Sequence, residues 1–206
     1  MRFKKFKFKK VNSTNNTAIR IIKSSNFKFG MVSANTQSSG KGQHGKKWIS
    51  YKGNIFVSFF HELKNINISL STLTKINCLL VKKTLEKYYK KKIVFKKPND
   101  LLINKKKISG ILQEIISISG NKFLIVGIGV NLIKSPEIKN YLTTNLSELI
   151  NKPINKINFE NELKIIFEKN LSRMYRINNK VKRNYMYILG DIGNTDTKLE
   201  PITSVS

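Results

Sequence analysis

The amino-acid sequence predicts an α+β fold, in which helices flank a mixed, largely antiparallel β-sheet. Segments with strand-like alternation and segments with helical spacing of apolar residues follow one another irregularly along the chain. Short turns join several of the strand-like segments, and strands joined in this way are antiparallel. The chain has 206 residues, 40% of them hydrophobic, which suits a single folded domain with a core of its own.

The first half of the chain predicts a strand, a helix, a buried strand and a second helix. Residues 6–11 alternate like a strand, and the polar residues 12–15 can cap the free backbone N–H groups of a helix that follows them. Residues 54–63 are rich in Phe and Val, which indicates a buried strand. From Leu70 onward apolar residues recur at helical spacing, so we expect a helix that ends near Tyr89.

The middle of the chain predicts a series of short antiparallel strands. Residues 92–97 form a short strand that Pro98 stops. Residues 101–104 and 108–119 are separated by turn residues and predict a hairpin, and a second turn leads into an apolar strand over residues 122–132. Further on, we expect one more amphipathic helix over residues 158–175, followed by a polar tail.

Composition limits the classes of function. The formal net charge is +27, but only five of the 39 basic residues are arginine, which favours compositional drift over a dedicated nucleic-acid surface. The lysines could still steer an anionic ligand or an acidic partner protein. One cysteine, Cys78, excludes an internal disulfide framework and fits a reducing cytoplasm. No apolar run approaches the roughly 20 residues of a membrane span, and the basic N-terminus lacks the apolar core of a signal peptide.

Residues 37–48, QSSGKGQHGKKW, hold three glycines in the pattern G-x-G-x-x-G, three lysines and the only tryptophan of the chain. A dinucleotide-binding fingerprint must open a helix, because the helix N-terminus holds the pyrophosphate. A strand-like segment follows here instead, which excludes that interpretation. Two interpretations stay open: a hydrophilic surface loop, or a loop that binds phosphate through its backbone N–H groups and lysines.

Three segments further along the chain carry polar residues or glycines next to predicted strands. Residues 96–100, KKPND, are an ordinary turn when taken alone, although they hold a carboxylate and an amide. Lys107 opens a predicted strand, and taken alone it is an ordinary solvated lysine. The glycines of residues 127–131, GIGVN, indicate close approach by a backbone or a ligand.

Taken together and in order, the segments GKGQHGKKW, KKPNDLL, KKISGILQE and VGIGVN closely resemble the biotin protein ligase family, as do NSTN and TQ before them. The resemblance covers about residues 6–135. It implies a class II synthetase-like biotin/lipoate ligase catalytic domain with a two-step reaction. Biotin and ATP form biotinyl-5'-AMP and pyrophosphate, and a lysine of a biotin carboxyl carrier domain then accepts the biotin. Mg²⁺ is implied, held mainly through phosphates, so we expect no metal ligands among the side chains.

The resemblance also implies roles for individual residues. Lys107 would bridge the biotin carboxyl group and the α-phosphate, Lys41 would contact the adenylate phosphate, and Asp100 would orient and help deprotonate the acceptor lysine. The expected biotin site contains Lys41 and Lys107 together with Ser13, Thr14, Gln37, Gly40, Gly110, Gly127 and Gly129. The expected ATP or adenylate site shares the two lysines and adds Gln43, Trp48, Asn99 and Asn131.

The sequence departs from the family pattern at three positions. Lys41 and Gln43 stand where the family typically has arginine, and Lys97 replaces the usual tryptophan before the proline. Lysine cannot bind a phosphate through two parallel hydrogen bonds as arginine does, and glutamine removes a charge. A weaker hold on the adenylate is therefore expected.

The expected domain organisation follows from the same resemblance. Residues 1–177 would form the catalytic domain, and residues 178–206 a polar tail that represents a truncated or vestigial C-terminal β-barrel. No helix-turn-helix precedes residue 11, so we expect no DNA-binding module. We further expect no membrane association, and a monomer or a weak homodimer.

Two other functions remain as alternatives. A lipoate- or octanoate-protein ligase-like transferase would share the fold, but the Arg-Arg-x-x-Gly-Gly-Gly type of motif is absent from the sequence. A basic RNA-binding protein without catalysis would explain the charge, but it predicts exposed aromatic residues interleaved with arginine. Most phenylalanines here lie in strand-like apolar runs instead. A degenerate ligase with slow turnover is a variant of the main hypothesis.

Overall fold

The computed structural model describes residues 2–63 and 68–180. Its strands are β1 (Lys4–Val11), β2 (Phe29–Gln37), β3 (Ile55–Glu62), β4 (Val94–Lys96), β5 (Asp100–Ile103), β6 (Lys106–Ile118) and β7 (Asn121–Val130). Its helices are α1 (Thr14–Ser24), α2 (Leu70–Leu85), α3 (Leu146–Ile150) and α4 (Lys156–Lys180), with a 3₁₀ turn at Gln43–Gly45.

The strands form one seven-stranded sheet in the order β1-β2-β3-β7-β6-β5-β4. Only β1 and β2 pair in parallel, because α1 carries the chain from the end of one to the start of the other. Each of the other neighbouring pairs, β2–β3, β3–β7, β7–β6, β6–β5 and β5–β4, is antiparallel. The predicted α+β fold with a mixed, largely antiparallel sheet and flanking helices is therefore confirmed.

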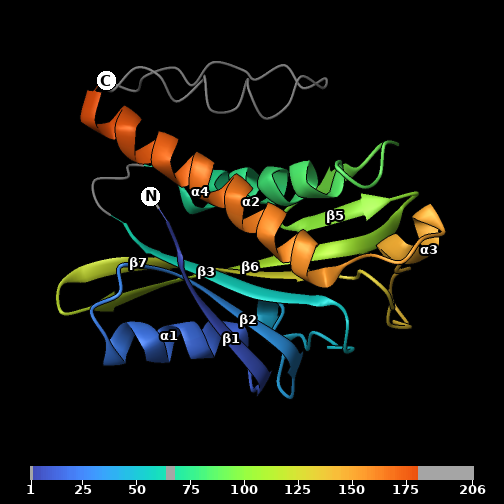
Figure 1. Cartoon of the computed structure of the whole chain (residues 1–206), viewed down its shortest axis with the longest axis horizontal. Coiled ribbons are helices and arrows are strands. Elements are labelled where there is room, and N and C mark those ends of the chain that lie inside the picture. Colours follow the sequence, from blue (N-terminus) through green and yellow to red (C-terminus); the bar gives the residue numbers. More distant parts are fainter. Residues whose placement is uncertain (1, 64–67, 181–206) are drawn as a thin grey trace.

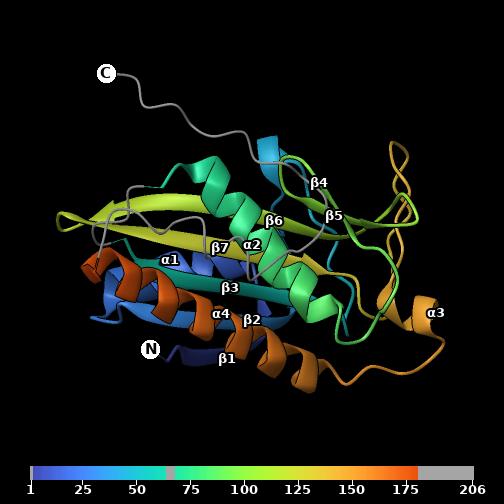
Figure 2. The same ribbon diagram turned by 90° about the horizontal axis from the view of Figure 1, so that it is seen from above.

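Helices cover both faces of the sheet. Helix α1 lies on one face, whereas α2 and α4 lie on the other and contact each other (Figures 1 and 2). The larger core fills the layer beneath α2 and α4 and includes Phe59, Leu85 and Phe167, with the rings of Phe59 and Phe167 stacked 4.3 Å apart. The smaller core, around Ala18 and Phe60, lies between α1 and the sheet. Burial of these apolar faces stabilises the layers.

Several boundaries differ from those predicted. The segment before the glycine-rich loop forms β2, a strand that the sequence did not indicate because Gly30, Ser33 and Ala34 have little strand preference. Gly30 is required there, since a Cβ atom would collide with the Phe60 ring. Helix α2 ends at Leu85 rather than near Tyr89, and irregular turns follow it.

The predicted domain boundary falls inside the last helix. Helix α4 begins two residues before the predicted start at residue 158 and continues to Lys180, past the boundary expected at residue 177. Residues 181–206 of the predicted polar tail lie outside the described residues, so the tail and its relation to a barrel stay predictions. No helix of the described part of the chain is long and apolar enough to cross a bilayer.

Two buried side chains have strongly shifted pKa values. Burial lowers the pKa of His61 from 6.5 to about 4, against the weaker opposing effect of the Glu62 carbonyl group. Burial also raises the pKa of the Cys78 thiol to about 12, and the negative charge of Asp100 adds to the effect. Cys78 therefore stays a protonated thiol inside α2, and His61 stays a neutral imidazole.

Because His61 is neutral when folded, acid should destabilise the protein. Between pH 6.5 and about 4 the unfolded chain binds a proton at His61 that the folded chain does not. The free energy of unfolding should fall as the pH drops through this window, by about 3 kcal/mol near pH 4. Urea unfolding at pH 7 and pH 4.5 measures this, with His61→Leu as the comparison. An equal loss of stability in both proteins would contradict the assignment.

Candidate active site

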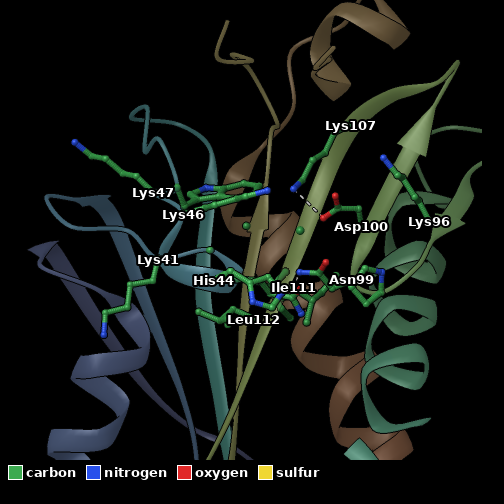
Figure 3. A pocket seen from close by; sticks show the side chains of 18 of the residues that line it. Lys41, His44, Lys46, Lys47, Lys96, Asn99, Asp100, Lys107, Ile111 and Leu112 are labelled. Carbon is green, nitrogen blue, oxygen red and sulfur yellow. Dashed lines mark hydrogen bonds and ion pairs between the residues drawn. The ribbon is translucent and has the colours of Figure 1, made fainter. Parts of the chain in front are cut away.

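A pocket of about 350 Å³ opens between the glycine-rich loop and the turn that joins β4 to β5 (Figure 3). Its floor is the ends of β6 and β7, and the N-terminal end of α1 closes one side. Its lining includes Ser13, Thr14, Asn15, Gln37, Lys41, Gln43, His44, Lys46, Lys47, Trp48, Lys96, Lys97, Asn99, Asp100, Lys105, Lys107, Gly110, Gly127, Gly129 and Tyr141. The four segments that resemble the ligase family are separate stretches of the chain, and residues of all four line this one pocket.

The strand register places glycines side by side in the floor. Gly110 of β6 is opposite Gly129 of β7, and Leu112 is opposite Gly127. A Cβ atom on Gly110 or Gly129 would collide with the indole ring of Trp48. A Cβ atom on Gly127 would collide with the side chain of Asn15. The missing side chains therefore open a hollow over the sheet, and Trp48 and Asn15 reach into it.

The glycine-rich loop folds back on itself as a small hairpin. Gly42 N–H donates to the Lys46 carbonyl at 2.6 Å, and Trp48 N–H donates to the Gly40 carbonyl at 2.9 Å. At its tip, His44 and Gly45 have φ angles of 53° and 72°, in the left-handed region. This folding points the Trp48 ring inward. Gly40 itself does not line the pocket but packs beneath the Trp48 carbonyl oxygen, where a Cβ atom would come within 2.5 Å.

Lys107 is held from several directions. Its ammonium forms an ion pair with Asp100 at 2.8 Å, drawn in Figure 3. It also lies 5.4 Å from the centre of the Trp48 ring and 5.2 Å from that of Tyr141, within cation–π range. The backbone of Lys107 accepts from Thr144 and donates to Leu142. These contacts hold the Lys107 ammonium in one position at the pocket.

Tyr141 is a pocket residue that the sequence did not indicate. It lies between β7 and α3, in a segment without strand or helix periodicity. Burial raises the pKa of its phenol, the negative charge of Asp100 adds to this, and Lys46 opposes it. The ring therefore remains a neutral aromatic face over Lys107.

The end of the pocket near α1 is polar. Gln37 Oε1 accepts from the Thr14 backbone N–H at 2.8 Å and from the Thr14 hydroxyl at 3.1 Å. Gln37 Nε2 donates to the Ser50 hydroxyl at 3.2 Å. Ser13, next to Thr14, is buried. These groups form a small hydrogen-bonding surface at the opposite end of the pocket from Lys107.

Asn15 is a second pocket residue that sequence reasoning missed. The sequence predicts a helix-capping residue at this position, but Asn15 is 3% exposed and joins α1, β3 and β6. Its amide donates to Glu114 of β6 at 2.5 Å, and its oxygen accepts from Ser58 of β3 at 2.5 Å. The only signal in the sequence was the glycine at 127, which makes room for it.

Three of the predicted site residues form hydrogen bonds with other parts of the protein. Asn131 does not line the pocket; it is buried, and its amide donates to the Thr144 carbonyl at 3.2 Å. Lys41 lines the pocket, but its ammonium donates to Asn16 at 3.0 Å and points away from Lys107 (Figure 3). Asn99 lines the pocket while its amide donates to the Ile111 carbonyl at 2.6 Å.

The described residues contain no cluster of three or more His, Cys, Asp or Glu side chains that could hold a metal ion. Asp100 is the only carboxylate among the described residues that line the pocket. A cation would therefore depend on the oxygens of a bound ligand and on water for most of its coordination.

Fold and pocket define an α+β domain with a lysine-lined pocket, in which a glycine-rich loop faces Lys107 across a glycine floor. A sequence model of the biotin/lipoate A/B protein ligase family matches residues 8–131, which is more than half of the chain. The chain belongs to this family.

Individual relatives agree with this. The chain is 30% identical to the bifunctional ligase/repressor BirA of Escherichia coli over 101 residues, which are 48% of this chain and 32% of the relative. It is 28% identical to BirA of Bacillus subtilis over 166 residues, which are 77% of this chain and 51% of the relative. The matches thus span about half, or less, of the length of these curated relatives.

Solved structures share the fold. The biotin protein ligase from Aquifex aeolicus in complex with biotin and ATP is 28% identical, with a TM-score of 0.74 over 92% of this chain and 76% of that chain. The Plasmodium falciparum protein LipL1 in complex with lipoate is more distant, at 17% identity and a TM-score of 0.56 over 87% of this chain and 64% of that chain. The second likeness shows the fold alone.

The glycine floor can be tested with the single tryptophan as a probe. Gly129→Ala should push the Trp48 ring out of the hollow, because the added Cβ atom occupies its place. The tryptophan emission should shift to the red as the ring meets more water, with a loss of stability of about 1–3 kcal/mol from overpacking. Lys122→Ala, at the far end of β7, is the control. An unchanged emission spectrum in Gly129→Ala would contradict the packing described.

Proposed function

We propose that this protein is an ATP-dependent biotin protein ligase. It would form biotinyl-5'-AMP from biotin and ATP, and then transfer biotin to a lysine of a biotin carboxyl carrier domain. The observation that carries the proposal is the pocket itself, where a fixed lysine, a carboxylate and a glycine-rich loop meet. The likeness to a ligase bound to biotin and ATP over 92% of this chain supports the choice of substrates.

In the first step, an oxygen of the biotin carboxylate attacks the α-phosphorus of ATP, and the bond to the β-phosphate breaks to release pyrophosphate. The carboxylate is already ionised near pH 7, so no general base is needed. What the step needs is positive charge near the phosphate, where charge develops in the transition state. Lys107 supplies it from a fixed position. Lys41 would add to it by turning from Asn16 toward the phosphate.

Biotin would occupy the part of the pocket between Lys107 and the polar end near α1. Thr14, Gln37 and Ser13 offer hydroxyl and amide groups for the polar ureido ring. Gly110, Gly127 and Gly129 would leave strand backbone on which an apolar ligand can pack, and Gly40 would act indirectly, by letting the loop close against the Trp48 carbonyl group. In this arrangement the biotin carboxyl group points toward Lys107.

The nucleotide would lie beneath the glycine-rich loop. Trp48 offers an aromatic wall, with Gln43 and Asn99 on either side of the pocket. Asn131 would act indirectly, because its buried amide holds the segment that carries Tyr141 and Thr144. Mg²⁺ would be held through the phosphates, and Asp100 is the one carboxylate of the described lining that could join it.

In the second step, the acceptor amine attacks the carbonyl carbon of the mixed anhydride, and AMP leaves. A lysine amine with a pKa near 10.4 is mostly protonated at pH 7. Asp100 would orient this amine and take its proton, because it lies beside Lys107 at the start of β5. The ion pair with Lys107 holds the carboxylate in position for this role.

The alternatives receive less support. The matched family includes lipoate ligases, but the solved structure at 28% identity is a biotin protein ligase, whereas the lipoate-bound structure is only 17% identical. An RNA-binding protein without catalysis would not account for the pocket or for the Lys107–Asp100 ion pair within it. We also propose that residues 1–177 act as the catalytic unit and that residues 178–206 are a polar tail that represents a truncated or vestigial C-terminal β-barrel.

Lys107→Ala tests the proposal most directly. The variant should lose biotin-dependent pyrophosphate release from ATP by about 100-fold or more, as expected for removal of a transition-state charge contact. Far-ultraviolet circular dichroism and thermal unfolding should change little. Lys106→Ala, the exposed neighbour on β6, is the matched control and should retain activity. Turnover like that of the unmodified protein in Lys107→Ala would refute the assigned role.

A second experiment concerns retention of the intermediate. Gln43 opens the 3₁₀ turn of the loop and lines the pocket, where an arginine would add a charged fork toward the phosphate. Gln43→Arg should slow escape of biotinyl-adenylate by about tenfold, measured as release of labelled intermediate from a preformed complex. Ser117→Arg adds the same charge far away on β6 and should not change the rate. Equal release from both variants would sink the idea.

A further inference from the structure

The mouth of the pocket carries more positive charge than an adenylate needs. Six exposed lysines line it besides Lys107: Lys41, Lys46 and Lys47 from the loop, Lys96 from the end of β4, Lys97 from the β4–β5 turn, and Lys105 from the β5–β6 turn. Among the described residues that line the pocket, Asp100 is the only carboxylate, and it is paired with Lys107. Biotinyl-adenylate has one negative charge, on its phosphate.

These six lysines are not neutralised by the protein. None of them forms an ion pair with a described residue, whereas the carboxylates of α4 are taken up by lysines elsewhere. Glu160, for example, is shared by Lys5 and Lys156, and Glu168 pairs with Lys164. The excess charge at the mouth therefore faces outward, toward whatever approaches the pocket.

These lysines fall into two groups. In the proposed function, Lys41, Lys46 and Lys47 of the loop would lie near the phosphates of ATP, which would account for them. Lys96, Lys97 and Lys105 lie on the other rim, where Lys96 and Lys107 flank Asp100 (Figure 3). An acceptor lysine must pass this rim to reach Asp100.

That passage is electrostatically unfavourable for a bare lysine. The acceptor arrives mostly as an ammonium ion at pH 7, and like charges repel. Acidic side chains around the acceptor would offset the repulsion and steer the encounter. Resting on the proposed ligase function, we propose that Lys96, Lys97 and Lys105 form a docking surface for an acidic carrier domain whose acceptor lysine is flanked by carboxylates.

Nucleic acid fits this surface less well. No arginine lies in the described lining, so the forked contacts to phosphates and base edges are missing. The aromatic rings at this rim are Trp48 and Tyr141, and both are engaged with Lys107 rather than free to stack on bases. Lysine point charges without stacking platforms suit a diffuse acidic protein surface.

Direct binding tests the docking surface independently of catalysis. A fluorescent carboxylase carrier domain with glutamates beside its acceptor position, whose acceptor lysine is replaced by arginine, is titrated with the protein. Lys96→Gln/Lys97→Gln/Lys105→Gln should weaken binding about tenfold or more at low salt. The matched control is Lys4→Gln/Lys7→Gln/Lys9→Gln, which removes the same charge from exposed positions on β1 at the opposite edge of the sheet. It should change binding less than about twofold.

Two further comparisons sharpen the result. Changing the carrier's flanking glutamates to glutamine should weaken binding as much as the rim variant does, and the two changes combined should add little. An equal loss in both lysine variants, no loss in either, or tight binding of homopolymeric RNA that displaces the carrier through the rim lysines would overturn the proposal. Pyrophosphate release is measured in parallel, so failure of the ligase function and failure of the docking surface are told apart.

Discussion

The register between β6 and β7 is the constraint on which the site depends. Side chains alternate between the two faces of a strand, so opposite residues share a face. With Gly110 opposite Gly129, two positions without side chains coincide, and Asp100 of β5 comes beside them in the same row. A slip of one residue would place Ile111 or Ile128 in the floor and turn the hollow into solid core. The hairpin at Ser119–Gly120, with both φ angles positive, holds the two strands in this pairing.

The glycine floor has no charged groups of its own, and the Lys107–Asp100 ion pair places charged groups at one end of the pocket. One ammonium group links β5, β6, the glycine-rich loop through Trp48, and the segment before α3 through Tyr141. Each contact restricts the same side chain, so the entropy lost in ordering a long lysine is shared among several interactions. The chain thereby fixes a charge that lysine on its own would leave mobile. The Lys107 ammonium therefore has a defined position in the pocket.

Local patterns in the sequence were enough for most of the fold and for the lysines and glycines of the site. The apolar run of residues 122–132 and the helical spacing of apolar residues over 70–85 are properties of each segment by itself. Strand β2 could not be predicted, because its small residues adopt a strand only through pairing with β1 and β3 on either side. The roles of Asn15 and Tyr141 could not be predicted for a similar reason. Each depends on a contact between segments remote in sequence, and neither residue type is distinctive where it stands.

The Lys107–Asp100 ion pair is another contact that the sequence does not predict. The family resemblance implies a separate role for each residue, whereas their pairing requires a shift in register between Leu101 and Leu102. Without that irregularity, Asp100 would lie opposite a different residue of β6, because each pair of the ladder would move by one. Local sequence does not encode such a shift visibly. It is settled by the packing of Leu101 and Ile103 into the core beneath α2, where both side chains are fully buried.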